Sequence, residues 1–330
     1  MPRRLRVGVS ACLLGHEVRW DGGHKRDRFV TNALGPWVEW VTVCPELELG
    51  LGVPREPIRL EGDPAAPRLV APKSRTDHTA AMLAFVRARV DRLVAEDLSG
   101  YVLKSDSPSC GMQRVRVHRP RGGAPARTGV GFFARVLRER LPLLPVEEEG
   151  RLNDPTLREN FVERLFAYER WKRLAARPTR AGLVAFHTAH KLLLLAHDPA
   201  AYRRLGRLVA RMKRRRAADV VATYGAAFMD ALAACATPDR HANVLEHMLG
   251  YVSGELAPEE RRELVELIAD HRRGLVPLVG PLTLMKHHVR RLDVAYLAGQ
   301  VYLDPYPREL MLSAGPGSSR RSGAARARSR

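Results

Sequence analysis

Residues 101–111, with the sequence YVLKSDSPSCG, constrain the fold more than any other stretch of the chain. The first three residues are apolar, as in a buried strand, and a polar loop with one proline then leads to Cys110. Open α/β sheets place their reactive side chains in loops of this kind, at the carboxyl ends of their strands. The segment therefore predicts an α/β domain with a functional thiol at one edge of the sheet.

Two further cysteines follow short apolar runs in the same way. Cys12 comes directly after residues 7–11, and Cys44 comes directly after residues 41–43. Pro45 ends the second run as a strand, because proline has no N–H to donate. Since parallel strands end at a common edge, we expect these two thiols and Cys110 to converge on one crevice. Cys235 lies in the apolar helical run DALAACA and is predicted to be a buried apolar side chain.

Length and composition limit the class of protein. The 330 residues are 45% hydrophobic and 28% charged, which excludes global disorder and suggests two domains. Four cysteines in so long a chain do not make a disulfide scaffold, and because they form no CxxC pair, neither a zinc ribbon nor a thioredoxin-like motif is expected. There is no run of 18 apolar residues, and the apolar stretch near the N-terminus is too short for a signal peptide. These features predict a cytoplasmic protein without a membrane partner.

The net charge of +19 is the second strong constraint. Residues 1–146 carry 24 basic and 15 acidic side chains, and residues 147–330 carry 31 and 21. Because both halves are basic, the charge favours a polyanionic partner with phosphates spread over a wide surface, such as RNA. The alternative is a solvated, arginine-rich surface that reflects only a GC-rich genome.

The first half alternates predicted strands and helices. A short helix is expected over residues 31–40, and the region 49–74, rich in proline and glycine, is expected to be loop and short strand. A helix over residues 80–98 is predicted to be capped by Thr76. A loop at 122–128, a helix at 128–141 and a last strand within 141–150 complete the pattern. This order predicts a mostly parallel sheet with flanking helices.

From residue 155 the apolar period changes to 3.6, and no strand pattern interrupts it. We therefore predict an all-α domain over residues 151–308, after an α/β domain over residues 1–150. Residues 309–330 end in a low-complexity stretch with five arginines and are predicted to be a disordered basic tail.

Three motifs resemble the thiouracil desulfidase (TudS) family: CLLG at 12–15, VCPE at 43–46 and KSDSPSCG at 104–111. Three stretches of the second half resemble a helical domain of unknown function that is often fused to that family: FHTAHKLLLLAH, NVLEHMLGYV and GLVPLVGPLTLMKHH. The combination is similar to bacterial tRNA 4-thiouridine desulfidases. The resemblance implies a [4Fe–4S] cluster held by Cys12, Cys44 and Cys110, with its fourth iron open to sulfur. Cys235 lies outside the motifs.

The chemistry implied by the resemblance needs a base as well as a metal centre. Thiolates are the usual ligands of iron–sulfur clusters, and a soft thiocarbonyl sulfur suits an open iron. Glu46 is the candidate general acid–base, and its alternative is a favourable charge at the start of a helix. Ser107 and Ser109 are candidates to bind the base edge or relay a proton. Their alternatives are turn capping and hydrogen bonds to the cluster.

Three weaker candidates for substrate binding are Asp21 in the WDGG loop, Lys104 and Ser105. Lys104 is placed to hold a phosphate or to balance the negative charge of the cluster, and a solvated lysine is the alternative. We expect tRNA to be recognised by shape and backbone. The candidate phosphate contacts are Lys191, Arg203, Arg204, Arg207 and Arg211, for which a solvated helix face is the alternative.

The sequence thus predicts an enzyme that hydrolyses the C–S bond of 4-thiouridine in tRNA, yielding uridine and sulfide. One alternative keeps this chemistry with a free thiolated base such as 2-thiouracil. The other is a non-catalytic RNA-binding protein whose cysteines hold a structural metal. No protein partner is evident.

Overall fold

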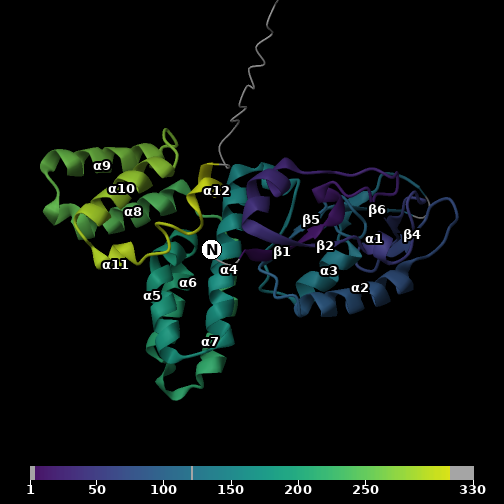
Figure 1. Ribbon diagram of the computed structural model, residues 1–330, viewed down its shortest axis with the longest axis horizontal. Helices are drawn as coiled ribbons and strands as arrows, with labels where there is room; N and C mark the ends of the chain where they lie inside the picture. Colours follow the sequence, from purple (N-terminus) through teal and green to yellow (C-terminus); the bar gives the residue numbers. More distant parts are fainter. Residues whose placement is uncertain (1–3, 120–121, 313–330) are drawn as a thin grey trace, which may run out of the picture.

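The computed structural model describes residues 4–119 and 122–312, excluding the side chains of residues 214, 311 and 312. An α/β part occupies one side of the molecule, and helices make up the rest (Figure 1). The predicted fold class is confirmed. Within the described part of residues 151–312, every regular element is a helix.

The first sheet carries the strands that the sequence predicted. It contains β1 (Leu5–Ser10), β2 (Val38–Val43), β5 (Gly100–Leu103) and β8 (Val146–Glu148), all parallel, in the order β2-β1-β5-β8. The central strands β1 and β5 are almost entirely buried, which is why they read as apolar runs. Gly8 is needed in β1 because a Cβ there would lie 2.1 Å from the ring of Tyr101 on β5.

A second sheet was not predicted, although two of its strands fall within residues 49–74, where loop and short strand were expected. It contains β3 (Arg59–Glu61), β4 (Arg68–Val70), β6 (Val115–His118) and β7 (Ala126–Gly129), in the order β4-β3-β6-β7. The prediction of a loop over 122–128 is therefore wrong at its carboxyl end. β7 reads ARTG and is largely exposed, so its pairing with β6 leaves no apolar signal in the sequence.

The helices of the first half differ from prediction at their ends. The segment predicted as a helix over 31–40 is a π-helical turn (Phe29–Leu34) and a 3-10 turn (Gly35–Trp37), after which β2 begins. α1 (Pro45–Glu48) is short. α2 (Thr79–Val94) starts after the predicted Thr76 cap, and Asp77 accepts the backbone N–H of Thr79. α3 (Phe132–Arg140) starts late because residues 126–129 pair in the second sheet.

The second half is built of helices around an aromatic core. Trp171, Phe186, Tyr224 and Phe228 pack together with ring centroids 5.1–6.0 Å apart. Within residues 200–236, whose amphipathic pattern is continuous in the sequence, one helix ends at Ala210 and the next begins at Ala217. The helices are α4 (Pro155–Ala176), α5 (Arg180–His197), α6 (Pro199–Ala210), α7 (Ala217–Ala233), α8 (Pro238–Val252), α9 (Pro258–Arg272), α10 (Val279–Arg291), α11 (Ala295–Ala298) and α12 (Arg308–Leu312).

α4 joins the two halves. Its Leu165 fills the space above Gly100, where a Cβ would lie 2.0 Å from the leucine side chain. Leu165 and Phe161 of α4 belong to the same buried cluster as Val7 of β1. The helical half is therefore packed directly on the first sheet.

The predicted tail over residues 309–330 falls mostly on residues 313–330, which lie outside the described part, whereas its first four residues belong to α12. Among described residues, none of the helices on its own has the length and apolar character needed to span a membrane. The segments Ala217–Ala233 and Pro238–Glu255 meet that criterion only together, and they are bent by 118° relative to each other.

Candidate active site

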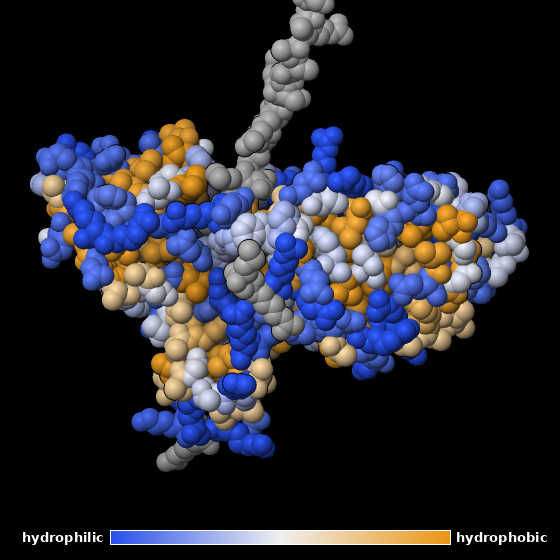
Figure 2. Space-filling view, viewed as in Figure 1, coloured by the Kyte–Doolittle hydropathy of each residue, from blue (hydrophilic) through white to orange (hydrophobic). Residues whose placement is uncertain are grey.

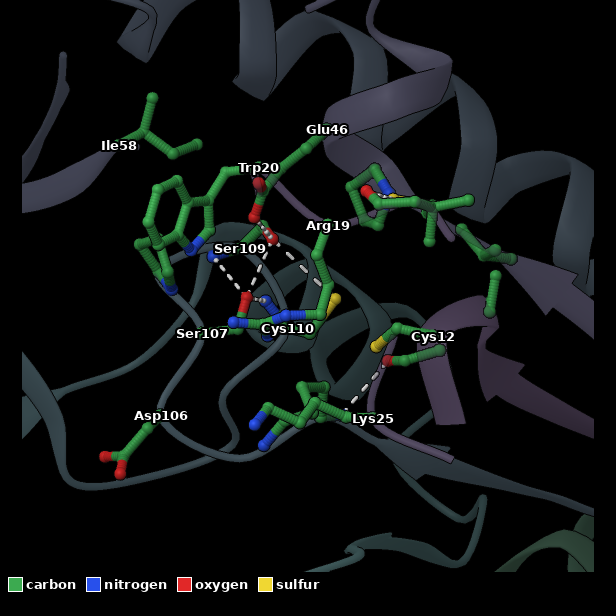
Figure 3. A pocket seen from close by; sticks show the side chains of 18 of the residues that line it. Cys12, Arg19, Trp20, Lys25, Glu46, Ile58, Asp106, Ser107, Ser109 and Cys110 are labelled. Atoms are coloured by element: carbon green, nitrogen blue, oxygen red, sulfur yellow. Dashed lines mark hydrogen bonds between the residues drawn. The ribbon is translucent and has the colours of Figure 1, made fainter. Parts of the chain in front are cut away.

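Three cysteines from distant parts of the chain line one cavity of about 350 Å³ at the carboxyl edge of the first sheet (Figure 3). Cys12 lies in a 3-10 turn directly after β1, and Cys44 is the residue between β2 and α1. Cys110 ends the loop that follows β5. The structure thus brings together the three thiols that the sequence singled out. Cys235 does not line this cavity, and the prediction that it is a buried helical side chain is wrong, because α7 (Ala217–Ala233) ends before it and Cys235 is only half-buried.

The thiols are mostly buried and electrostatically coupled. Burial raises the pKa of Cys12 to about 11, and it also raises the pKa values of Cys44 and Cys110. Cys44 contributes to the raised pKa of both other thiols, whereas Lys104 opposes the shift at Cys12. Such thiols stay neutral until a cation replaces their protons. All four cysteines of the chain are free, so these three are available as ligands.

This donor set fits an iron–sulfur cluster better than a single metal ion. Among described residues, no three His, Cys, Asp or Glu side chains are grouped closely enough to hold one ion. The ligands of a cluster bind different iron atoms and therefore stand farther apart. Three thiols around a common cavity, two of them buried, match that requirement, and thiolates are the usual ligands of such clusters.

Cys44 is held in place by the carboxylate of Glu48, which is itself bound by Arg89. Its backbone N–H donates to Oε1 of Glu48 at 3.0 Å, which closes the first turn of α1. Arg89 of α2 donates to Oε2 of the same carboxylate at 2.8 Å. The Cys44 sulfur lies 3.8 Å from the carbonyl oxygen of Val18.

The Cys110 loop is ordered by Ser107. The Ser107 hydroxyl accepts the backbone N–H groups of Cys110 at 3.1 Å and Ser109 at 3.3 Å. These bonds support the turn-capping interpretation of Ser107. Two glycines permit the tight packing of this loop: a Cβ on Gly111 would lie 2.8 Å from the Ser107 carbonyl oxygen, and one on Gly131 would lie 2.4 Å from that of Ser109.

Glu46 lies inside the cavity with both carboxylate oxygens engaged. The Ser109 hydroxyl donates to Oε1 at 2.7 Å, and Arg55 donates to Oε2 through Nη2 at 2.7 Å and Nε at 3.2 Å. Ser109 also lies 3.0 Å from the Ser107 hydroxyl and 3.7 Å from the Cys110 sulfur. A carboxylate, two hydroxyls and a thiol thus form one connected chain beside the cavity.

Lys104 and Ser105 line the cavity but are bound to a carboxylate behind it. Nζ of Lys104 lies 2.5 Å from Oε1 of Glu149, and Ser105 donates to the same carboxylate through its N–H and its hydroxyl. Lys104 is therefore not the freely solvated lysine of the alternative interpretation. Asp21 does not line the cavity. Its Oδ1 accepts the N–H of Gly23 at 3.1 Å and so stabilises an exposed turn.

Several lining residues had no signal in the sequence. Arg55 comes from a proline-rich loop. Trp20 comes from the WDGG loop, in which only Asp21 was predicted to be a site residue. Trp20 is 44% exposed and lies at the rim near Ile58 (Figure 3). Other lining residues that were not predicted as site residues include Ser10, Arg19, Lys25, Pro57 and Asp106.

The predicted phosphate contacts lie elsewhere. Lys191, Arg203 and Arg207 line a shallow hollow between α5 and α6, whereas Arg204 is 3.9 Å from Asp198 and Arg211 follows the end of α6. Hydrophilic side chains gather at the lower tip of the molecule, where α6 is followed by α7 (Figure 2). In Figure 1, α4 stands between α6 and the sheet.

Two family models match the chain. One, described as 2-thiouracil desulfurase, matches residues 7–149, and the other, described as a protein of unknown function (DUF1722), matches residues 191–307. "Uncharacterized protein YbgA" of Escherichia coli (strain K12) is 35% identical over 164 residues, which are 49% of this chain and 94% of that protein. A solved structure titled "[4Fe-4S]-dependent thiouracil desulfidase TudS" is 30% identical, with 46% of this chain and 94% of that chain covered and a TM-score of 0.38.

Residues 7–149 thus match the 2-thiouracil desulfurase model and residues 191–307 match the DUF1722 model, in agreement with the resemblance carried by the motifs in both halves. Since nearly all of YbgA is covered at that identity, the chain belongs to the YbgA family.

Proposed function

We propose that the protein is a [4Fe–4S]-dependent desulfidase that converts 4-thiouridine in tRNA to uridine and releases sulfide. The observation that carries this proposal is the convergence of Cys12, Cys44 and Cys110 on a cavity that also contains Glu46. The match to the 2-thiouracil desulfurase model over residues 7–149 supports the same chemistry.

The three cysteines would hold the cluster from three separate elements of the sheet edge. When bound, a four-iron cluster with three protein ligands supplies one iron that is open to a soft thiocarbonyl sulfur. Loss of any one cysteine removes a ligand that no other described thiol near the cavity replaces, because Cys235 lies outside it.

Glu46 is the base in this proposal. It takes a proton from the water that adds to the thiolated carbon, a role worth about 10²–10⁴-fold in rate. Arg55 fixes one carboxylate oxygen, so the other stays directed at Ser109 and the cavity. Ser109 and Ser107 then provide a path for a proton to the ring nitrogen. The reaction consumes one water, exchanges sulfur for oxygen at the carbon, and releases hydrogen sulfide.

The choice of tRNA as substrate is supported by charge. The net charge of +19 suits a polyanion, and the hollow between α5 and α6 carries Lys191, Arg203 and Arg207. A second candidate is a free thiolated base such as 2-thiouracil. The description of the family model favours this candidate.

The test is anaerobic incubation of the full chain with bulk tRNA and, separately, with free 2-thiouracil, followed by nucleoside and sulfide analysis. We expect 4-thiouridine to fall as uridine and sulfide rise. Consumption of 2-thiouracil alone would assign the free base as substrate. A colourless protein that holds zinc and leaves both compounds unchanged would support the non-catalytic RNA-binding alternative.

Cysteine variants provide the matched control for this experiment. Cys110→Ala should lose the iron, the acid-labile sulfide and the turnover together. Cys235→Ala should keep all three, since that residue does not reach the cavity. Equal iron content in the two variants would contradict the proposed ligand set.

A further inference from the structure

A second, larger cavity lies between the two halves of the molecule. This groove has a volume of about 800 Å³ and is bounded by α3, the segment 141–147, α4 and α7. Its wall on α4 lies between the two matched regions, 7–149 and 191–307, so neither family model includes it.

Arg164 of α4 lines this groove without a partner. Its Nε is sealed from solvent and has no hydrogen-bond acceptor, and among described residues no carboxylate forms an ion pair with it. Burial lowers the pKa of this guanidinium. A partly buried guanidinium whose Nε has no acceptor costs stability, and an anion bound in the groove would offset that cost.

The carboxylate that favours the charge of Arg164 most is Glu147, which is already bound to another arginine. Glu147 accepts from Nε of Arg151 at 2.6 Å. Two further arginines of α3, Arg135 and Arg138, line the same groove and form no ion pair in the described structure. Two exposed carboxylates, Glu139 and Asp230, also line it. The groove is therefore lined by three unpaired guanidinium groups and two unpaired carboxylates, which leaves an excess of positive charge.

We propose that this groove binds a phosphate-bearing ligand, with Arg164 as the inner anchor and Arg135 and Arg138 as outer contacts. A guanidinium group binds phosphate through two parallel N–H donors. A phosphate in the groove would therefore accept hydrogen bonds from the Arg164 donors that have no acceptor within the protein. The groove is wider than one phosphate group needs, so a nucleotide or the backbone of an oligonucleotide fits its size. The site is independent of the desulfidase proposal, because it uses none of the residues around the cysteines.

The test is thermal denaturation of the full chain at constant ionic strength with inorganic phosphate, uridine 5′-monophosphate or oligouridylate in place of chloride. We expect phosphate-bearing compounds to raise the melting temperature in proportion to binding. If oligouridylate raises the melting temperature more than the mononucleotide does, the groove binds an RNA backbone. If both raise it equally, the groove binds a single phosphate group. No response beyond that to chloride overturns the proposal.

Substitution separates a ligand site from a structural arginine. Arg164→Met should melt at the same temperature as the parent or higher without ligand, and should weaken phosphate binding by about 10- to 100-fold. Arg87→Met, at an exposed position on α2, is the matched control and should change neither property. A destabilised Arg164→Met that still responds to phosphate overturns the proposal.

The outer contacts keep the proposal testable if Arg164→Met fails to fold. Arg138 is exposed, so Arg138→Gln should fold normally and reduce the response to phosphate. An unchanged response in the combined variant Arg135→Gln, Arg138→Gln overturns the placement of the ligand in this groove.

Discussion

Gly131 offers a sharp test of how tightly the Cys110 loop is packed. The residue precedes α3 with φ −64° and ψ 147°, a conformation open to any amino acid, so only space excludes a side chain. A Cβ there would lie 2.4 Å from the carbonyl oxygen of Ser109 and 2.9 Å from the nitrogen of Cys110. Both are backbone atoms, which cannot rotate away. The first contact is about 1 Å too short for ordinary van der Waals packing.

Gly131→Ala should therefore displace the loop that carries Cys110 by roughly 1 Å, at a cost of about 1–3 kcal/mol in the free energy of unfolding. A shift of this size at one ligand is enough to impair a site that needs fixed geometry. We expect a lower melting temperature together with reduced iron and acid-labile sulfide per chain after anaerobic purification.

Gly250→Ala is the matched control. Gly250 lies within α8, and no atom lies within 4 Å of the position that its Cβ would occupy. Replacing a glycine in a helix by alanine should stabilise the chain by up to about 1 kcal/mol and leave the iron content unchanged. Full iron content and an unchanged melting temperature in Gly131→Ala would show that the loop can move without affecting the site, which would refute the reasoning.

Three further predictions concern catalysis and stability. Glu46→Gln should keep the iron content and lose about 10²–10⁴-fold in kcat, and near-normal turnover would remove this carboxylate from the reaction. Trp20→Ala should raise KM by roughly 10-fold with unchanged iron, as expected when a base loses a stacking partner; an unchanged KM would place the substrate elsewhere. Burial lowers the pKa of His190 to about 3 and that of His187 to about 4, so below pH about 6.5 the unfolded chain binds more protons than the folded chain. The melting temperature should accordingly fall as the pH drops from about 6.5 to 4, and a flat profile across that range would contradict the burial of these imidazoles.

The cysteine-bearing edge of the sheet could be predicted because its strands are buried on both faces. β1 and β5 read as continuous apolar runs, and each is followed at once by a turn. Neighbouring parallel strands must end at one edge, so Cys12 and Cys110 had to approach each other once the order β2-β1-β5 formed. No longer-range information was needed for this part of the site.

The rest of the site depends on contacts that have no local signature. Glu149 binds Lys104 across 45 residues of sequence, and no pattern near either residue indicates it. β7 is mostly exposed and too short to alternate, so this strand of the second sheet gave no signal in the sequence. Asp21 was singled out by its loop, but the residue of that loop that lines the cavity is Trp20.

The guanidinium of Arg55 touches three separate segments at once. Its Nη1 donates to the carbonyl oxygens of Val18 at 3.0 Å and Gly52 at 2.9 Å, while Nε and Nη2 bind Glu46. Val18 also faces the sulfur of Cys44. A single long side chain thus ties the position of the proposed base to that of a ligand-bearing turn, so the two cannot drift apart independently. Any attempt to redesign the entrance for a bulkier substrate must preserve this arginine or rebuild all three walls together.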